Sequence, residues 1–279
     1  MEYRPEDLKR LQDTELDILK EIIRVCERNQ IQYFGVYGTL LGAVRHGGFI
    51  PWDDDIDIGM LREDYERFLK IAPTQLKKGY TLQHFSIDPN APAYFAKVRK
   101  DGTRFLEKNL RHLPIHHGIF VDIFPYDAVP EDLKERERYN RRIQIWFQIY
   151  NAKSLWTTAK HIIPVWYKRY AVNAVRIMLH ILLLPVKKEY LFRKLDLAMR
   201  CYDKQDTALV SERGGVTPAC ALDDYFPVQM KAFGDIQIAV PNHYDKVLTK
   251  NYGDYMQLPP EGKRISHSPQ ELAFENASN

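Results

Sequence analysis

The chain has 279 residues, of which 45% are apolar and 28% charged, so it is long enough for one large globular domain. Its N-terminus, Met-Glu-Tyr-Arg-Pro-Glu-Asp, lacks the apolar stretch of a secretory signal, and no run of 18 apolar residues predicts a transmembrane helix. The three cysteines have no metal-ligand spacing and favour reduced thiols, so we expect a cytoplasmic protein.

The net charge of +3 conceals an uneven distribution. The segment 138–188, here called the basic block, holds ten Lys or Arg residues and three of the four tryptophans, and it contains no Asp or Glu. The rest of the chain carries 30 basic residues against 37 acidic ones. The chain is therefore an acidic protein with one basic, aromatic segment.

Hydrophobic periodicity and turn residues predict the following elements in chain order. We expect an amphipathic helix over 6–29, a strand over 31–37, a short helix over 40–46 ended by Gly47-Gly48, a strand at 55–59 and a helix over 63–72. Strands follow near 80–86 and 93–100 and over 118–124, where Pro125 stops the last one. Several helices are expected up to about 205, then a hairpin near 226–240, a helix over 244–251 and an irregular tail. This order predicts an α+β core with a helical insertion.

Four aspartates lie in the run Trp52-Asp53-Asp54-Asp55-Ile56-Asp57-Ile58. Because residues two apart in a strand point to the same face, Asp55 and Asp57 would present two neighbouring carboxylates, with Ile56 and Ile58 facing the core. Such carboxylates repel each other unless a cation lies between them. Hard oxygen ligands suit Mg²⁺ or Mn²⁺ with a phosphate-bearing substrate, so the run predicts the metal site of a phosphotransferase.

A third acid, Asp122, lies between Val121 and Ile123 in an apolar strand. Burial of an uncompensated acid is costly, so we expect Asp122 to complete a triad with Asp55 and Asp57. Two roles remain open for it: metal ligand, or general base for an acceptor hydroxyl.

The acidic run admits two other interpretations. A solvated loop is the more common context for clustered acids, but it does not explain the isoleucines. A calcium-binding EF-hand loop requires Gly at its sixth position and Glu at its twelfth, where this chain has Ile58 and Asp64. The EF-hand is therefore rejected.

The segment before the acidic run ends a strand in Gly38-Thr39 and then begins a helix. Backbone N–H groups at a helix start favour phosphate, which makes Gly38 and Thr39 candidate substrate-binding residues. A simple turn with Thr39 as the helix N-cap is the alternative.

Several segments together resemble the LicD family. They are Tyr37-Gly38-Thr39-Leu40-Leu41-Gly42-Ala43-Val44-Arg45, Phe49-Ile50-Pro51-Trp52 with the acidic run, Gly118-Ile119-Phe120-Val121-Asp122-Ile123-Phe124-Pro125, and a tail with Tyr252-Gly253-Asp254-Tyr255-Met256, Leu258-Pro259-Pro260, Arg264 and His267. The resemblance implies a nucleotidyltransferase fold with a mixed-sheet core. It also implies that Gly38-Thr39, Asp55, Asp57 and Asp122 are the family's site residues.

The resemblance implies transfer of phosphocholine from CDP-choline to a cell-surface glycan precursor such as teichoic acid. Related members, including the fukutin group, use other CDP-alcohols such as CDP-ribitol. We expect a catalytic core over 1–137, a helical insertion over 138–205, and a C-terminal part over 206–279 that completes the core and the cleft.

Further basic residues are candidates for phosphate or nucleotide binding. Lys97 and Arg99 alternate with apolar residues on a predicted strand and would bind the donor's diphosphate, although an exposed strand face explains them equally well. Arg45 follows the predicted phosphate turn. Arg264 and His267, in the tail, would close over the nucleotide.

The basic block suggests a contact of its own. Lys and Arg attract anionic lipid, and Trp and Tyr favour the membrane interface, so 138–188 is predicted to rest on the inner leaflet or to grip an anionic polymer. Ordinary amphipathic helices packed on the core are the alternative.

Two other functions compete with phosphocholine transfer. A nucleotidyltransferase would move NMP from an NTP to a phosphorylated alcohol and release pyrophosphate. A nucleic-acid-binding protein would use the basic block, but the positive charge is confined to one segment, and we expect no nucleic-acid partner.

Overall fold

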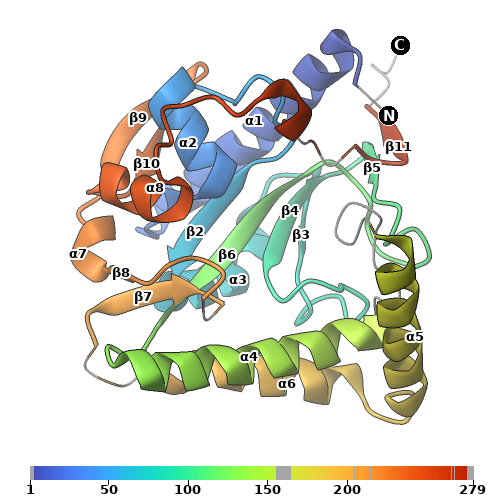
Figure 1. Cartoon of the computed structure of the whole chain (residues 1–279). Coiled ribbons are helices and arrows are strands. Elements are labelled where there is room, and N and C mark those ends of the chain that lie inside the picture. The colour runs from blue at the N-terminus through green and yellow to red at the C-terminus, as the bar shows by residue number, and fades with distance from the viewer. Residues whose placement is uncertain are drawn as a thin grey trace.

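The computed structural model describes residues 3–154, 165–203, 205, 207–213, 215–264, 266 and 268–274. Within them the chain is an α+β protein built on a seven-stranded mixed sheet, as the sequence predicts (Figure 1). The strands of this sheet are β1 (Phe34–Gly35), β2 (Asp57–Leu61), β3 (Tyr80–Gln83), β4 (Ala96–Lys100), β6 (Phe120–Ala128), β7 (Leu209–Glu212) and β8 (Cys220–Ala221). Their order is β1-β2-β6-β4-β3, with β7 paired to β6 and β8 to β7.

Strand β6 is the centre of the sheet, and eight of its nine residues are buried. It pairs in parallel with β2, which sets Asp57 opposite Asp122, and antiparallel with β4, which sets Lys97 opposite Asp122. Three charged residues predicted for the site therefore occupy adjacent positions on three neighbouring strands.

The prediction that Pro125 stops this strand is wrong, because β6 continues to Ala128. Backbone N–H groups alternate sides along a strand, and the N–H of Asp122 points toward β2, where it donates to Ile56 O. Position 125 therefore faces the other side. There the β4 pairing has ended at Ile123 and the β7 pairing begins only at Tyr126, so proline's missing N–H interrupts no ladder bond.

Helices α1 (Pro5–Arg28) and α3 (Arg62–Gln75) contact the central strands and each other, so they cover the same face of the sheet (Figure 1). The predicted stripe of α1 is buried, with Leu11, Ile18, Leu19 and Ile22 at 0% exposure. Burial of an apolar stripe, rather than helix propensity alone, holds such a helix on the sheet.

A second group of elements packs around α2 (Tyr37–His46). It contains the hairpin β9 (Gln229–Phe233) and β10 (Ile236–Val240), with α7 (Leu222–Tyr225) and α8 (Tyr244–Tyr252), and confirms the predicted hairpin and last helix. Gly47 ends α2 in the left-handed region, at φ +65°, as the Gly-Gly pair predicts. The predicted strand at 31–37 is shorter than expected and reduces to β1.

Three helices follow β6: α4 (Leu133–Ser154), α5 (Trp166–Leu182) and α6 (Lys188–Met199). Helices α4 and α6 pack together along one edge of the molecule and bury residues in the core, whereas α5 buries none (Figure 1). The remaining elements are a helical turn at 200–202, another at 261–263, and β11 (Glu271–Ala273), which pairs with β5 (Arg104–Leu106). Among the described residues, every helix is too short or too polar to cross a bilayer. The predicted division of the chain into 1–137, 138–205 and 206–279 stays a prediction.

A buried ion pair connects α3, β6 and α6. The guanidinium of Arg62 donates to both carboxylate oxygens of Asp127, at 2.6 and 2.7 Å, and to Asp196 at 3.2 Å. Both Arg62 and Asp127 are buried.

We predict that Arg62→Met lowers the free energy of unfolding by about 3–5 kcal/mol, because it leaves the Asp127 carboxylate buried without its partner. Urea denaturation followed by circular dichroism measures the change. The double variant Arg62→Met/Asp127→Leu removes both charges and should lose less. Lys9→Ala, which breaks an exposed pair with Asp13, is the control and should cost under about 1 kcal/mol. A loss below 1 kcal/mol in Arg62→Met would contradict the prediction.

Candidate active site

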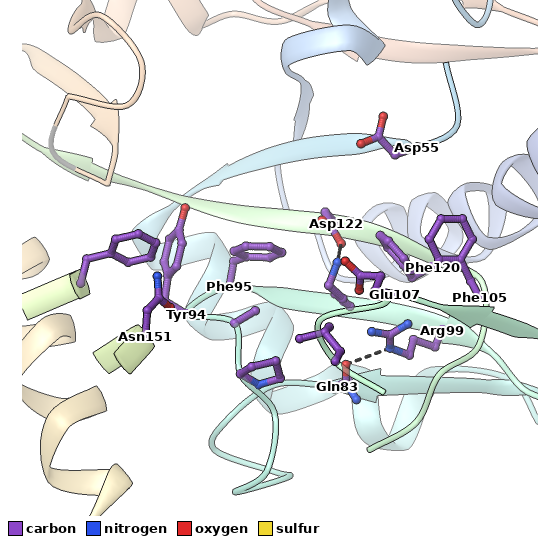
Figure 2. Close-up of a pocket in the computed structure, with 15 residues that line it drawn as sticks. Asp55, Gln83, Tyr94, Phe95, Arg99, Phe105, Glu107, Phe120, Asp122 and Asn151 are labelled. Atoms are coloured by element: carbon purple, nitrogen blue, oxygen red, sulfur yellow. Dashed lines mark hydrogen bonds and ion pairs between the residues drawn. The ribbon is translucent and has the colours of Figure 1, made fainter. Parts of the chain in front are cut away.

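Two cavities meet at Asp55. The larger one, of about 610 Å³, is here called the acidic cavity; its lining includes Gly38, Arg45, Trp52, Asp53, Asp55, Asp57, Tyr252 and Tyr255. The smaller one, of about 270 Å³, is here called the aromatic cavity; its lining includes Asp55, Gln83, Tyr94, Phe95, Lys97, Arg99, Phe105, Glu107, Phe120, Asp122, Phe147 and Asn151 (Figure 2). Asp55 is the residue that lines both.

The predicted alternation of the acidic run holds. Asp53, Asp55 and Asp57 are partly exposed and all line the acidic cavity, whereas Ile56 and Ile58 are fully buried. Regular strand structure begins only at Asp57, so Asp55 lies on the loop just before β2.

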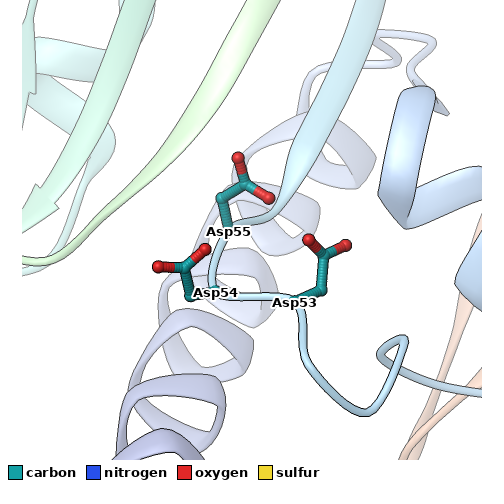
Figure 3. A group of neighbouring side chains, drawn as sticks. All are labelled: Asp53, Asp54 and Asp55. Carbon is teal, nitrogen blue, oxygen red and sulfur yellow. The ribbon is translucent and has the colours of Figure 1, made fainter. Parts of the chain in front are cut away.

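Among the described residues, the carboxylates of Asp53, Asp54 and Asp55 form a group close enough together to hold one metal ion. Each offers a carboxylate oxygen within 4.8 Å of the others (Figure 3). Asp54 is 1% exposed, and one of its oxygens accepts from the hydroxyl of Tyr3 at 2.6 Å and from the backbone N–H of Ser268 at 3.1 Å. Asp54 therefore connects the acidic loop to both ends of the chain.

Asp57 and Asp122 lie opposite each other in the parallel register. Burial raises the pKa of Asp57 well above its ordinary value, and the charges of Asp55, Asp122 and Asp53 raise it further. Burial also raises the pKa of Asp122, to about 6, against the opposing effect of Lys97. The ammonium of Lys97 donates to Asp122 Oδ1 at 2.6 Å, and it lies 3.5 Å from the centre of the Phe120 ring.

A further acid that the sequence did not single out, Glu15, approaches the cluster from α1. It is 1% exposed, and burial followed by the charges of Asp55 and Asp54 raises its pKa well above the ordinary value. Its position in an amphipathic helix gave no sign of this proximity. The site thus concentrates more negative charge than the predicted triad.

Helix α2 approaches the acids through its first turn. Thr39 is the third residue of this helix and not its N-cap, which is Val36. Its buried hydroxyl accepts from the backbone N–H of Asp57 at 2.8 Å and so fixes the first residue of β2. Gly38 lines the acidic cavity, and a Cβ there would lie 2.4 Å from Asp53 Oδ2. Gly38 therefore lets the helix start contact the acidic loop.

The other predicted binding residues divide between the cavities. Arg45 lines the acidic cavity and donates to the carbonyl of Tyr255 at 2.7 Å. Arg264 stacks over Trp52, with 4.5 Å between the guanidinium carbon and the ring centre. His267 lies outside the described residues.

Lys97 and Arg99 line the aromatic cavity, not the acidic one. Arg99 is 1% exposed and donates to Gln83 at 2.8 Å and to the carbonyl of Gly118 at 2.6 Å. The alternative of an exposed strand face does not apply to these two side chains, because both are buried.

A buried carboxylate lies beside the aromatic cavity. Glu212 of β7 is fully buried and accepts from the hydroxyls of Tyr37, at 2.9 Å, and Tyr94. It thereby ties the first residue of α2 to the lining of the aromatic cavity. Helix α4 adds Phe147 and Asn151 to the same lining. Sequence reasoning missed Glu212, Phe147 and Asn151, because no local pattern marks a contact between distant segments of the chain.

The donor set fits a hard divalent cation. Asp53, Asp55 and Asp57 offer carboxylate oxygens to one cavity, Glu15 adds negative charge behind them, and the cation nearest to Asp122 is Lys97 on the other side. Oxygen-only ligands with room for a phosphate are the arrangement that Mg²⁺ and Mn²⁺ use. Asp55 and Asp57 would hold such an ion.

Comparison with known proteins gives two kinds of match. The family model described as LicD/FKTN/FKRP, nucleotidyltransferase domain, matches residues 30–167, which include the acidic run and Asp122. The lipopolysaccharide cholinephosphotransferase LicD of Haemophilus influenzae is 33% identical over 261 residues, covering 92% of this chain and 94% of that protein.

Two further matches cover shorter segments of the chain. The ribitol 5-phosphate transferase FKRP of Homo sapiens is 46% identical over 43 residues, 15% of this chain and 9% of that protein. An uncharacterized protein of Rickettsia typhi is 44% identical over 70 residues, 25% of this chain and 23% of its own length.

We predict that the chain binds Mn²⁺, and that Asp55→Asn and Asp57→Asn each weaken binding by at least about tenfold, because each removes a charged oxygen ligand. Electron paramagnetic resonance of free Mn²⁺ measures the affinity. Asp13→Asn, an exposed aspartate on α1, is the matched control and should bind as the parent does. Equal affinity in all four proteins would remove the metal assignment.

Proposed function

The chain belongs to the LicD family and is a phosphotransferase, and we propose that it moves phosphocholine from CDP-choline to a sugar hydroxyl of a cell-surface glycan or teichoic acid precursor, releasing CMP. The match to the Haemophilus influenzae enzyme over nearly the whole of both chains supports the phosphocholine part. The three cysteines are free thiols, which fits the reducing cytoplasm as the place of reaction.

The observation that carries the proposal is the position of Asp55 between two cavities of different chemistry. Phosphoryl transfer places the leaving oxygen and the attacking oxygen roughly in line on opposite sides of the phosphorus. A donor phosphate beside Asp55 would have its CMP in one cavity and the acceptor hydroxyl in the other.

The acidic cavity suits the CMP portion of the donor. Trp52 lines it and is stacked under Arg264, so an aromatic surface and a cation lie at the same wall. The N-terminal turn of α2 reaches this cavity at Gly38, and backbone N–H groups at a helix start favour phosphate. A divalent ion held by Asp55 and Asp57 would supply the positive charge that offsets the diphosphate.

The aromatic cavity suits the acceptor. Aromatic walls with a few polar groups are typical of sites for small molecules, and here Gln83 and Asn151 offer hydrogen bonds to sugar hydroxyls. Asp122 faces this cavity with its charge balanced by Lys97. Of the two roles open for Asp122, we therefore propose general base over metal ligand.

The reaction then proceeds in one displacement. The acceptor oxygen forms a bond to the phosphorus of phosphocholine, the bond from that phosphorus to the CMP oxygen breaks, and the acceptor proton passes to Asp122. Lys97 holds the Asp122 carboxylate toward the hydroxyl. CMP leaves with the electron pair of the broken bond.

We predict that the purified chain with Mg²⁺, with water in place of the acceptor hydroxyl, releases CMP from CDP-choline faster than from CDP-glycerol or CDP-ribitol. Asp57→Asn should reduce this rate by at least about 10²-fold with an unchanged circular dichroism spectrum, because charge stabilisation is lost at the phosphate. Chromatography of the nucleotide products measures it, with Asp13→Asn as control. Release of pyrophosphate from CTP and phosphocholine, with no CMP from any CDP-alcohol, would establish the competing nucleotidyltransferase function.

We also predict that Asp122→Asn separates the two roles of that residue. As a general base, its loss should lower kcat by about 10²- to 10⁴-fold while the Mn²⁺ affinity changes less than about twofold. Steady-state kinetics and the Mn²⁺ titration test this on the same preparation. A fall in Mn²⁺ affinity that matches Asp57→Asn would instead make Asp122 a metal ligand.

A further inference from the structure

Helix α5 carries its apolar residues on the outside. None of its 17 residues is buried. Half of the large apolar side chains that the described structure exposes belong to α5 and the residues next to it: Val165, Trp166, Tyr167, Tyr170, Val172, Val175, Ile177, Met178, Ile181, Leu182 and Leu184. A contiguous exposed apolar patch of this kind marks a surface that contacts a partner or a membrane.

The polar residues of α5 occupy the opposite, less exposed stripe. Arg169, Asn173, Arg176 and His180 follow one another at intervals of four, three and four, so they lie on one face, and all are only partly exposed. The ring of His180 contacts the carbonyl of Ala152 on α4 at 3.1 Å. In a helix packed on a hydrophobic core the apolar face is buried and the polar face is exposed, so α5 has the reverse arrangement.

The attachment of α5 to α4 is polar as well. The ammonium of Lys153, near the end of α4, donates to the carbonyls of Leu183 and Leu184 at 2.8 and 3.0 Å, just after the last residue of α5. The helix is thereby held at the edge of the molecule (Figure 1), and its large apolar side chains are exposed.

The charged residues around α5 indicate which kind of partner its apolar face contacts. Lys168 and Lys187 are exposed, and no acidic residue occurs between positions 138 and 188. Two copies of this chain meeting through α5 would bring like charges together, which disfavours self-association. Nucleic acid would meet an outward face that is apolar, where the phosphates find no partner. An anionic lipid surface satisfies both properties, because its head groups attract the lysines and its acyl boundary accepts the apolar face.

We propose that α5 is an amphipathic helix that docks the protein on an anionic membrane and lies in the plane of the interface. At 1.5 Å per residue it is about 25 Å long, which suits a helix lying on the surface. Trp166, Tyr167 and Tyr170 cluster at its first turn, with ring centres 5.9 and 6.1 Å from Trp166, and such rings favour the head-group level. The proposal narrows the predicted contact from 138–188 to α5, because α4 and α6 each bury part of their apolar residues in the protein, whereas α5 buries none.

The test is sedimentation of the full chain with vesicles. Binding to phosphatidylcholine mixed with phosphatidylglycerol should exceed binding to phosphatidylcholine alone and should weaken with added salt. Ile177→Asp/Ile181→Asp should lower the partition coefficient at least about tenfold, since two apolar side chains no longer enter the lipid. Both positions are exposed, at 43% and 58%, so the fold should tolerate the change, which thermal unfolding verifies.

The matched control is Leu197→Asp on α6, a leucine that is 55% exposed on a different helix and should bind vesicles as the parent does. The fluorescence of Trp166, obtained by subtracting the emission spectrum of Trp166→Phe from that of the parent, should shift to shorter wavelength when anionic vesicles are added. The inference is wrong if the parent does not bind anionic vesicles, or if the control loses binding as much as the double variant. A concentration-dependent dimer that the double variant abolishes, without vesicle binding, would assign α5 to self-association instead. None of these outcomes depends on which CDP-alcohol is the donor.

Discussion

Repulsion among carboxylates is the constraint on which this structure depends. The parallel register of β2 with β6 sets Asp57 beside Asp122, and the loop before β2 adds Asp53 and Asp55. Groups of like charge in a partly buried place raise one another's pKa and destabilise the fold unless cations offset them. Lys97 offsets Asp122 from the β4 side. The remaining carboxylates face the acidic cavity, where a divalent ion would complete the balance.

The rest of the fold holds this cluster in place. The Thr39 hydroxyl fixes the backbone of Asp57, Asp54 ties the acidic loop to Tyr3 and Ser268, and Glu212 joins α2 to the aromatic cavity. Each of these contacts spans a long stretch of chain and uses a buried polar group with a defined partner. Such contacts rigidify a site more than apolar packing does, because their geometry is directional.

The basic block combines two roles that its composition does not separate. Helix α4 places Phe147 and Asn151 in the aromatic cavity and, with α6, packs on the core. Helix α5 turns its apolar face outward. If α5 rests on a membrane, α4 is the element that connects that surface to the cavity proposed for the acceptor. The docking surface and the reaction site would then belong to one continuous piece of structure.

The sequence by itself determined the elements whose signal is local. Periodicity predicted α1, α3, the β9–β10 hairpin and α8, and the alternation of Asp55 and Asp57 with Ile56 and Ile58 predicted which side chains of the acidic run share an open face and which are buried. It also singled out Asp122 as a buried strand acid. Only the tertiary structure decided how these pieces combine. The register between β2 and β6, the approach of Glu15, the Glu212 contacts and the passage of β6 through Pro125 depend on pairing between distant segments, which local pattern does not encode. The outward face of α5 was undecidable for the same reason, because an amphipathic stripe shows which residues share a face but not what that face meets.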